Sequence, residues 1–137
     1  MKTAIVLGTR PEIIKLSPLI KQLNKKSTSV IFTGQHYDYN MSMNFIDQLG
    51  MSKPNYSMKI PRMKPTLQVA EIIKKLSKIL ETEKPETVIV QGDTNTVLAA
   101  GIASLKSNIP ISHIESGLRS FDWRMPEEHN RIIVDHF

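Results

Sequence analysis

The sequence contains no cysteine in its 137 residues, which excludes a disulfide framework and any thiolate metal site. It also lacks an apolar run approaching the roughly 18–20 residues that cross a bilayer as a helix. The apolar run that follows Lys2 is shorter than the core of a secretory signal, which needs about 7–15 residues. We therefore expect a cytoplasmic protein with no membrane partner.

Aromatic residues are scarce, at 6% of the chain, and 18 basic residues stand against 13 acidic ones. The net charge of +5 suits either a nucleic-acid surface or a pocket for a phosphorylated small molecule. Many lysines fall on expected helices, where a solvated helix face is the ordinary explanation. No aromatic RNA-binding strand, zinc-finger spacing or helix-turn-helix pattern accompanies them, so nucleic acid is not an expected partner.

What is present is an alternation of short apolar runs with amphipathic segments. The apolar runs predict buried strands over residues 3–7, 29–33, 86–91 and 109–114. Apolar residues at helical spacing predict helices over residues 10–23, 38–49, 66–81 and 95–107, and from residue 126 onward. Residues 51–65 and 115–125 are predicted to be loops. The alternation predicts an α/β fold, a parallel sheet with helices on both faces.

The first predicted helix has a clear start in the sequence, whereas the last one has no clear end. Thr9 and Glu12 form a Thr-x-x-Glu capping box, with Pro11 in the first turn. Pro18 is expected to kink or break the first helix. Phe137 falls inside the last predicted helix with no stop signal before it, so we expect residues 1–137 to be a domain that is incomplete at its carboxyl end.

Four polar clusters follow predicted strands, at residues 8–10, 33–36, 91–94 and 113–117. The carboxyl ends of parallel strands share one edge, and open α/β folds bind their ligands there. Neither a G-x-G-x-x-G nor a G-x-x-x-x-G-K-[ST] motif occurs, so no dinucleotide cofactor or P-loop is expected. The clusters favour acid–base chemistry on an anionic substrate.

Three carboxylates are candidates for that chemistry. Glu115 directly follows an apolar strand, so partial burial is expected, and burial favours the protonated form that suits acid–base work near neutrality. Asp93 is either such a group or a helix cap. Glu127 is either catalytic or an ordinary residue of a first helical turn, paired with Arg131 one turn on.

Basic and histidine side chains add further candidates. Arg10 lies beside a helix beginning, and a guanidinium and a helix N-terminus both attract phosphate. Lys15 belongs either to the same site or to a solvated pair with Glu12. His113 is expected to pack in or near the sheet. The other histidines lack the spacing of metal ligands, so no metal site is expected: His36, His129 and His136.

Four segments together resemble one known family. They read GTRPEIIKLSPLI, TGQH, VQGDTNTVLAA and HIESGLRSFDWRMPEEHNRIIVDH. In this order they are similar to the non-hydrolysing UDP-N-acetylglucosamine 2-epimerases, along the whole chain apart from residues 51–65. The GTRPE form favours the non-hydrolysing branch, and the SFD-x-x-MPEE form resembles the archaeal type.

The resemblance implies one half of a two-domain, glycosyltransferase-B-like architecture, with the substrate between two Rossmann-like domains. The implied reaction converts UDP-N-acetylglucosamine to UDP-N-acetylmannosamine by elimination and re-addition of UDP, without a cofactor, and generally serves surface polysaccharides. Asp93, Glu115 and Glu127 match the family's essential carboxylates, with the roles of acid and base left open. Arg10 and Lys15 match residues that contact the substrate.

The resemblance also implies a homodimer and an effector site, which Gln35 and His36 match in part. Pro65 stands where that site usually has a glutamine, which speaks against allosteric activation. The family's second, UDP-binding domain is absent from residues 1–137, so we expect this chain alone to be inactive. Two other classes remain open: a non-catalytic or split-chain nucleotide-sugar-binding module, and a basic nucleic-acid binder, which has no use for carboxylates on its binding edge.

Overall fold

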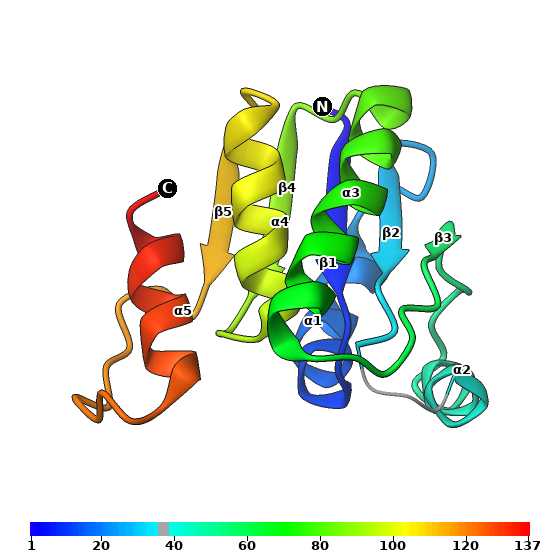
Figure 1. The fold of residues 1–137 in the computed structure, drawn as a ribbon. Helices are drawn as coiled ribbons and strands as arrows, with labels where there is room; N and C mark the ends of the chain where they lie inside the picture. Colours follow the sequence, from blue (N-terminus) through cyan, green and yellow to red (C-terminus); the bar gives the residue numbers. More distant parts are fainter. Residues whose placement is uncertain (36–38) are drawn as a thin grey trace.

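The computed structural model describes residues 1–35 and 39–137 and shows a sheet with helices packed against both faces (Figure 1). In this part of the chain, five parallel strands form the sheet in the order β3-β2-β1-β4-β5. The strands are β1 (Thr3–Leu7), β2 (Thr28–Phe32), β3 (Tyr56–Ser57), β4 (Thr87–Gln91) and β5 (Ile111–Ile114). The predicted Rossmann-like α/β fold is thereby confirmed.

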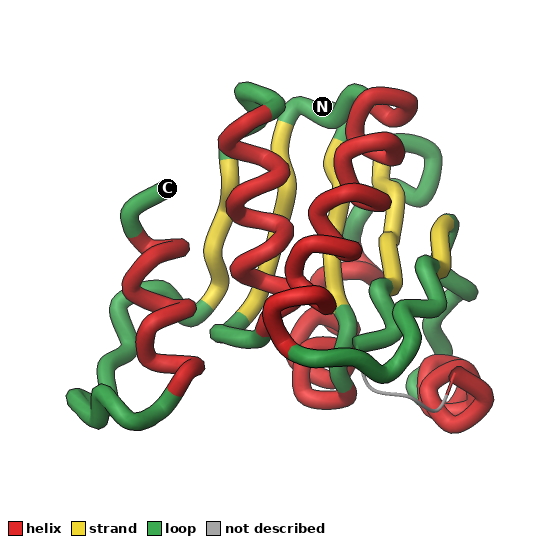
Figure 2. Tube along the Cα trace, viewed as in Figure 1, coloured by secondary structure: helices red, strands yellow, loops and turns green. Residues whose placement is uncertain are grey.

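The central strand β1 is buried along its whole length, because helices cover its faces and other strands cover its edges. Its register aligns Thr3 with Thr28 of β2 and with Thr87 of β4. All the strands run in the same direction, so the loops after β1, β4 and β5 gather along one edge of the sheet (Figure 2).

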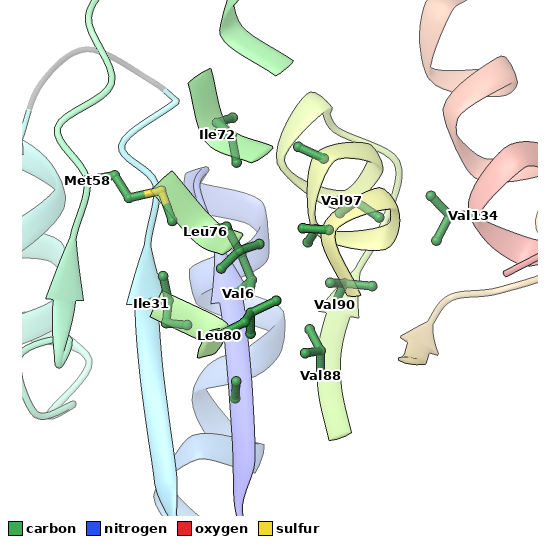
Figure 3. Close-up of a cluster of buried hydrophobic side chains, with 14 of the residues drawn as sticks. Val6, Ile31, Met58, Ile72, Leu76, Leu80, Val88, Val90, Val97 and Val134 are labelled. Carbon is green, nitrogen blue, oxygen red and sulfur yellow. The ribbon is translucent and has the colours of Figure 1, made fainter. Parts of the chain in front are cut away.

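The helices divide between two apolar cores. They are α1 (Arg10–Gln22), α2 (Tyr39–Gln48), α3 (Pro65–Glu83), α4 (Asn95–Lys106) and α5 (Pro126–Asp135). Alternate residues of a strand point to opposite faces. Val6 of β1 packs with Leu76 of α3 and Val97 of α4 (Figure 3), whereas Ile5 packs in a second core with Ile13 of α1.

Helix α1 begins as predicted and continues through Pro18 without a break. The predicted Thr9 and Glu12 cap the helix, and Glu12 accepts a hydrogen bond from the backbone N–H of Thr9 at 2.9 Å, whereas the Thr9 hydroxyl makes no cap hydrogen bond. Pro18 has no N–H to donate to the carbonyl of Ile14, four residues earlier. The hydroxyl of Ser17 donates to that carbonyl at 3.0 Å instead, so the lost bond is replaced locally.

One other prediction about the elements was wrong. Residues 51–65, predicted as a loop, contain β3, which is only two residues long and therefore shows no periodicity; it pairs with Ile31 and Phe32. Helix α5 begins at Pro126, as predicted, and runs to Asp135. The N–H groups of His136 and Phe137 bond to carbonyls three residues back, which tightens and closes the last turn.

The remaining helices and strands begin and end within two residues of their predicted bounds. No helix in the described part of the chain has both the length and the apolar character needed to cross a membrane.

Candidate active site

A cavity of about 500 Å³ lies at the carboxyl ends of β1, β4 and β5, on the predicted ligand edge. Most of the predicted site residues line it: Lys15, Gln35, Asp93, Glu115 and Glu127. Arg10 is not among the lining residues, and His36 lies outside the described residues. A second cavity, of about 380 Å³, lies between α1 and residues 50–55 and contains none of the predicted residues.

Glu115 follows the last residue of β5 and is held by two other elements. Lys15 of α1 donates to Glu115 Oε1, with the two atoms 2.6 Å apart, and Gln91 Nε2 donates to Oε2. The carboxyl side chain is 32% exposed, which agrees with the expected partial burial. Its φ of +68° is a strained backbone conformation for a residue other than glycine, of a kind that clusters at functional sites. Lys15 therefore pairs with Glu115 rather than with Glu12.

Asp93 lies between β4 and α4 and forms an ion pair with Arg131 of α5. Its backbone carbonyl accepts a hydrogen bond from Asn130 at 2.9 Å. The N-cap of α4 is Thr94, whose hydroxyl accepts from the N–H of Val97 at 3.3 Å. The alternative in which Asp93 serves as a helix cap is therefore wrong, and its carboxylate is left facing the cavity and the guanidinium.

Arg131 connects two carboxylates. It contacts Glu128 at 2.9 Å as well as Asp93, and its side chain is only 15% exposed. The hydrogen bond with Asp93 is the largest cause that raises the pKa of Arg131, and the charge of Glu127 adds to it. The expected ion pair of Arg131 with Glu127 is thus replaced by pairs with Asp93 and Glu128, while Glu127 remains exposed at the cavity wall.

Glu128, which sequence reasoning did not select, is 1% exposed and organises the loop before α5. Its carboxylate accepts hydrogen bonds from the backbone N–H groups of Ser120 and Phe121. The bond from Ser120 is the main cause that lowers the pKa of Glu128, against the opposing effect of burial. The spacing of Glu128 and Arg131, three residues apart on a helix, was the only sequence signal for this network.

Glu12 fills the helix N-terminus at which the sequence predicted phosphate. Its buried carboxylate accepts from the N–H groups of Gly8 at 2.5 Å and Thr9 at 2.9 Å, and from the hydroxyl of Thr94. Burial raises the pKa of Glu12, and these hydrogen bonds oppose the rise. Arg10 points elsewhere, with its guanidinium 4.6 Å from the centre of the Phe45 ring, so this turn is occupied by the chain's own groups.

The candidate effector residue Gln35 is anchored to α4. Its side-chain carbonyl accepts from the N–H of Thr96 at 2.9 Å and from its hydroxyl at 2.7 Å. Pro65 is the first residue of α3, a position suited to proline because no helical bond is lost there. One turn on, the buried Gln68 accepts from Asn95 at 2.9 Å, so an amide side chain still lies close to Gln35.

His113 packs against the sheet, as expected, with 7% of its side chain exposed. Its ring nitrogens lie 2.7 Å from an Asp135 carboxylate oxygen and 2.6 Å from the Gly92 carbonyl oxygen. Hydrogen bonds from Gly117, Arg119 and His113 outweigh burial and lower the pKa of Asp135. Within the described residues, no group of three His, Asp or Glu side chains could hold a metal ion.

Together these features define a Rossmann-like domain with a cavity lined by carboxylates and cations at the carboxyl edge of its sheet. The chain belongs to the UDP-N-acetylglucosamine 2-epimerase family, whose sequence profile matches residues 20–137. It is 50% identical over 135 residues to the UDP-N-acetylglucosamine 2-epimerase of Methanococcus maripaludis, covering 98% of this chain and 37% of that protein.

A solved structure and a further relative support the same family. The crystal structure of Methanocaldococcus jannaschii UDP-GlcNAc 2-epimerase in complex with UDP-GlcNAc and UDP is similar with a TM-score of 0.94 and 46% identity, over 99% of this chain and 38% of that one. A Pseudomonas aeruginosa relative, UDP-2,3-diacetamido-2,3-dideoxy-D-glucuronate 2-epimerase, is 42% identical over 138 residues, covering 98% of this chain and 39% of that protein. The chain thus spans less than two fifths of these relatives and corresponds to one half of their glycosyltransferase-B-like architecture.

Proposed function

We propose that this chain forms one wall of the active site of a UDP-N-acetylglucosamine 2-epimerase, which interconverts UDP-N-acetylglucosamine and UDP-N-acetylmannosamine. The observation that carries the proposal is the meeting of Lys15, Asp93, Glu115 and Glu127 around one cavity, in a chain of this family. These side chains come from α1, from the segments that follow β4 and β5, and from α5, so only the folded chain assembles them.

The reaction requires a base that removes the proton on carbon 2 of the sugar while the bond from carbon 1 to UDP breaks. A proton then returns to carbon 2 from the opposite face, and UDP adds again at carbon 1. Asp93 and Glu115 each place a carboxyl group at this cavity, where the first pairs with Arg131 and the second with Lys15, and a carboxylate can accept a proton. Glu127 lines the same cavity. The base that removes the proton and the acid that returns it are therefore among Asp93, Glu115 and Glu127.

Lys15 is the side chain of this wall that binds the diphosphate of the substrate. Its ammonium lies 2.6 Å from Glu115 in the structure, and a bound diphosphate competes for it. Binding of the anionic substrate then frees Glu115 next to the sugar. Arg10 contacts the substrate only after leaving its position over Phe45.

We propose UDP-N-acetylglucosamine as the substrate because two relatives named UDP-N-acetylglucosamine 2-epimerase are 50% and 47% identical to this chain. The diacetamido-glucuronate 2-epimerase is 42% identical. We further propose that the complete enzyme is a cytoplasmic homodimer that uses no cofactor and serves surface polysaccharide synthesis. Gln35 and His36 are the proposed part of an effector site on this domain.

The test is a chimera in which this chain replaces the matching 37% of the Methanococcus maripaludis protein. We expect the purified chimera to convert UDP-N-acetylglucosamine to UDP-N-acetylmannosamine, measured by chromatography. Asp93→Asn and Glu115→Gln chimeras should lose this conversion while keeping their fold. A folded chimera that binds the nucleotide sugar without converting it would instead establish a non-catalytic binding module.

A further inference from the structure

Gln91, the last residue of β4, is 3% exposed, and its side chain contacts one of the candidate carboxylates. Its side-chain nitrogen donates to Glu115 Oε2. A carboxylate only accepts hydrogen bonds, so this contact fixes which end of the amide is nitrogen and which is oxygen. The carbonyl oxygen of Gln91 must therefore point away from Glu115.

That carbonyl oxygen, Oε1, is buried and has no hydrogen-bond partner among the described residues. A buried acceptor without a donor costs free energy, and such groups in a folded protein call for a functional or solvent explanation. Gln91 lines the same cavity as Asp93 and Glu115. The missing donor is therefore expected from a molecule bound in this cavity.

We propose that Gln91 is a substrate-binding residue, whose side-chain carbonyl accepts a hydrogen bond from an O–H or N–H group of the sugar. This inference rests on the proposed epimerase function. The sugar, rather than UDP, supplies the donor because the same amide contacts Glu115, one of the groups that must reach carbon 2. Sugar hydroxyls and the acetamido N–H are donors, so one amide both orients Glu115 and holds the ring beside it.

Not every buried group without a partner lies at the cavity. The hydroxyl of Ser104 is buried inside α4 and also lacks a partner, but Ser104 does not line the cavity. It lies nine residues along α4 from the cavity residue Asn95, which is about 14 Å along the helix axis at about 1.5 Å per residue. Ser104→Ala is therefore a matched control that removes a buried, unpartnered polar atom away from the ligand.

The experiment uses the chimera with Gln91→Met, which keeps the side-chain length and removes both polar atoms. We expect KM for UDP-N-acetylglucosamine to rise about tenfold, because the variant loses one hydrogen bond to the substrate. Inhibition by UDP alone should be unchanged, because UDP lacks the sugar. The Tm should change little, because the variant removes the unpartnered acceptor and because Glu115, which loses its donor Gln91, is 32% exposed and keeps its ion pair with Lys15. Ser104→Ala should leave both kinetic constants as in the parent chimera.

An unchanged KM would overturn the proposal, and so would an equal loss of affinity for UDP and for the nucleotide sugar. A fall in Tm without a change in KM would show that the amide is purely structural. If the methionine variant does not fold, Gln91→Asn can be measured instead. It shortens the side chain by one methylene, and KM for UDP-N-acetylglucosamine should again rise. A parent chimera that neither binds nor converts the nucleotide sugar would refute the proposed function, independently of Gln91.

Discussion

Glu12 combines deep burial with several hydrogen bonds, and its titration is tied to the stability of the fold. Burial raises the pKa of Glu12 above the ordinary value of 4.5. A group with a higher pKa in the folded than in the unfolded state stabilises the fold while it is protonated. This contribution is fully present below pH 4.5 and is lost as the pH rises through the higher pKa of the folded state.

Glu12→Gln should therefore gain stability relative to the parent chain as the pH rises, because the variant has no buried carboxyl group to ionise. The measurement is the difference in Tm between the two chains from about pH 4 to about pH 8. Glu83→Gln is the control of opposite sign, since a hydrogen bond from Ser29 is the main cause that lowers the pKa of Glu83. A Tm difference for Glu12→Gln that is independent of pH would show that Glu12 does not titrate in this range.

Gly8 is required by the close approach of Thr33, which follows β2, and Thr96, in the first turn of α4. A Cβ atom at this position would lie 2.2 Å from Thr33 Oγ1 and 2.3 Å from Thr96 Oγ1, which are hydrogen-bonded to each other at 2.9 Å. Gly8→Ala should lower the free energy of unfolding by about 1–3 kcal/mol, the usual cost of overpacking. Urea denaturation checks this, with Gly50→Asn as a control in open space at a φ of +65°. Equal stability of Gly8→Ala and the parent would mean that the threonines move apart freely.

Among the elements, α5 is joined to the carboxylates of the site through Arg131, in addition to the bonds of Asn130 and Asp135. Its guanidinium links Asp93, after β4, to Glu128, which holds the loop before α5. The side chain of Arg124, in that same loop, is 90% exposed and pairs only within the loop, with Asp122. The two arginines therefore differ in whether they fix a candidate catalytic group.

Arg131→Gln in the chimera should lower kcat about 100-fold, because a small displacement of a catalytic carboxylate is that costly. KM should change much less, since Arg131 acts on the substrate through Asp93. Arg124→Gln should leave kcat unchanged. Addition of guanidinium ion to Arg131→Ala should restore part of the rate, a rescue that a purely structural defect would not show. An Arg131→Gln chimera with normal kcat would remove Arg131 from the positioning of Asp93.

The sequence predicted elements well where a long or strongly apolar segment carries its own signal, as in β1 and α3. It failed for β3, which exists only through pairing with β2, and for Pro18, whose effect is offset by Ser17. For the site, the placement of polar clusters at strand ends was sufficient to bring Asp93 and Glu115 to one cavity. Their partners could not be predicted, because Lys15 and Glu115 are 100 positions apart and Arg131 and Asp93 are 38 apart.

On the scale of the whole molecule, residues 1–137 provide a packed sheet and, in the proposed function, one wall of an active site. Two apolar cores lie on opposite faces of the same sheet and share its central strand, so they should unfold together. The cavity opens at the edge of the sheet, and the related structure that holds UDP-GlcNAc is matched over only 38% of its length. We therefore expect this chain to fold by itself but not to catalyse the reaction by itself.

We expect residues 1–137 to show one cooperative unfolding transition in urea but no epimerisation, because in the proposed function these residues form only one wall of the active site. Mixing the chain with the separately expressed remainder of the Methanococcus maripaludis protein should restore conversion of UDP-N-acetylglucosamine, measured by chromatography. The same mixture made with Glu115→Gln should remain inactive, which excludes conversion by the remainder alone. Turnover by residues 1–137 without a partner would show that the carboxylates and Lys15 hold the nucleotide sugar unaided, and the proposed one-sided site would then be wrong.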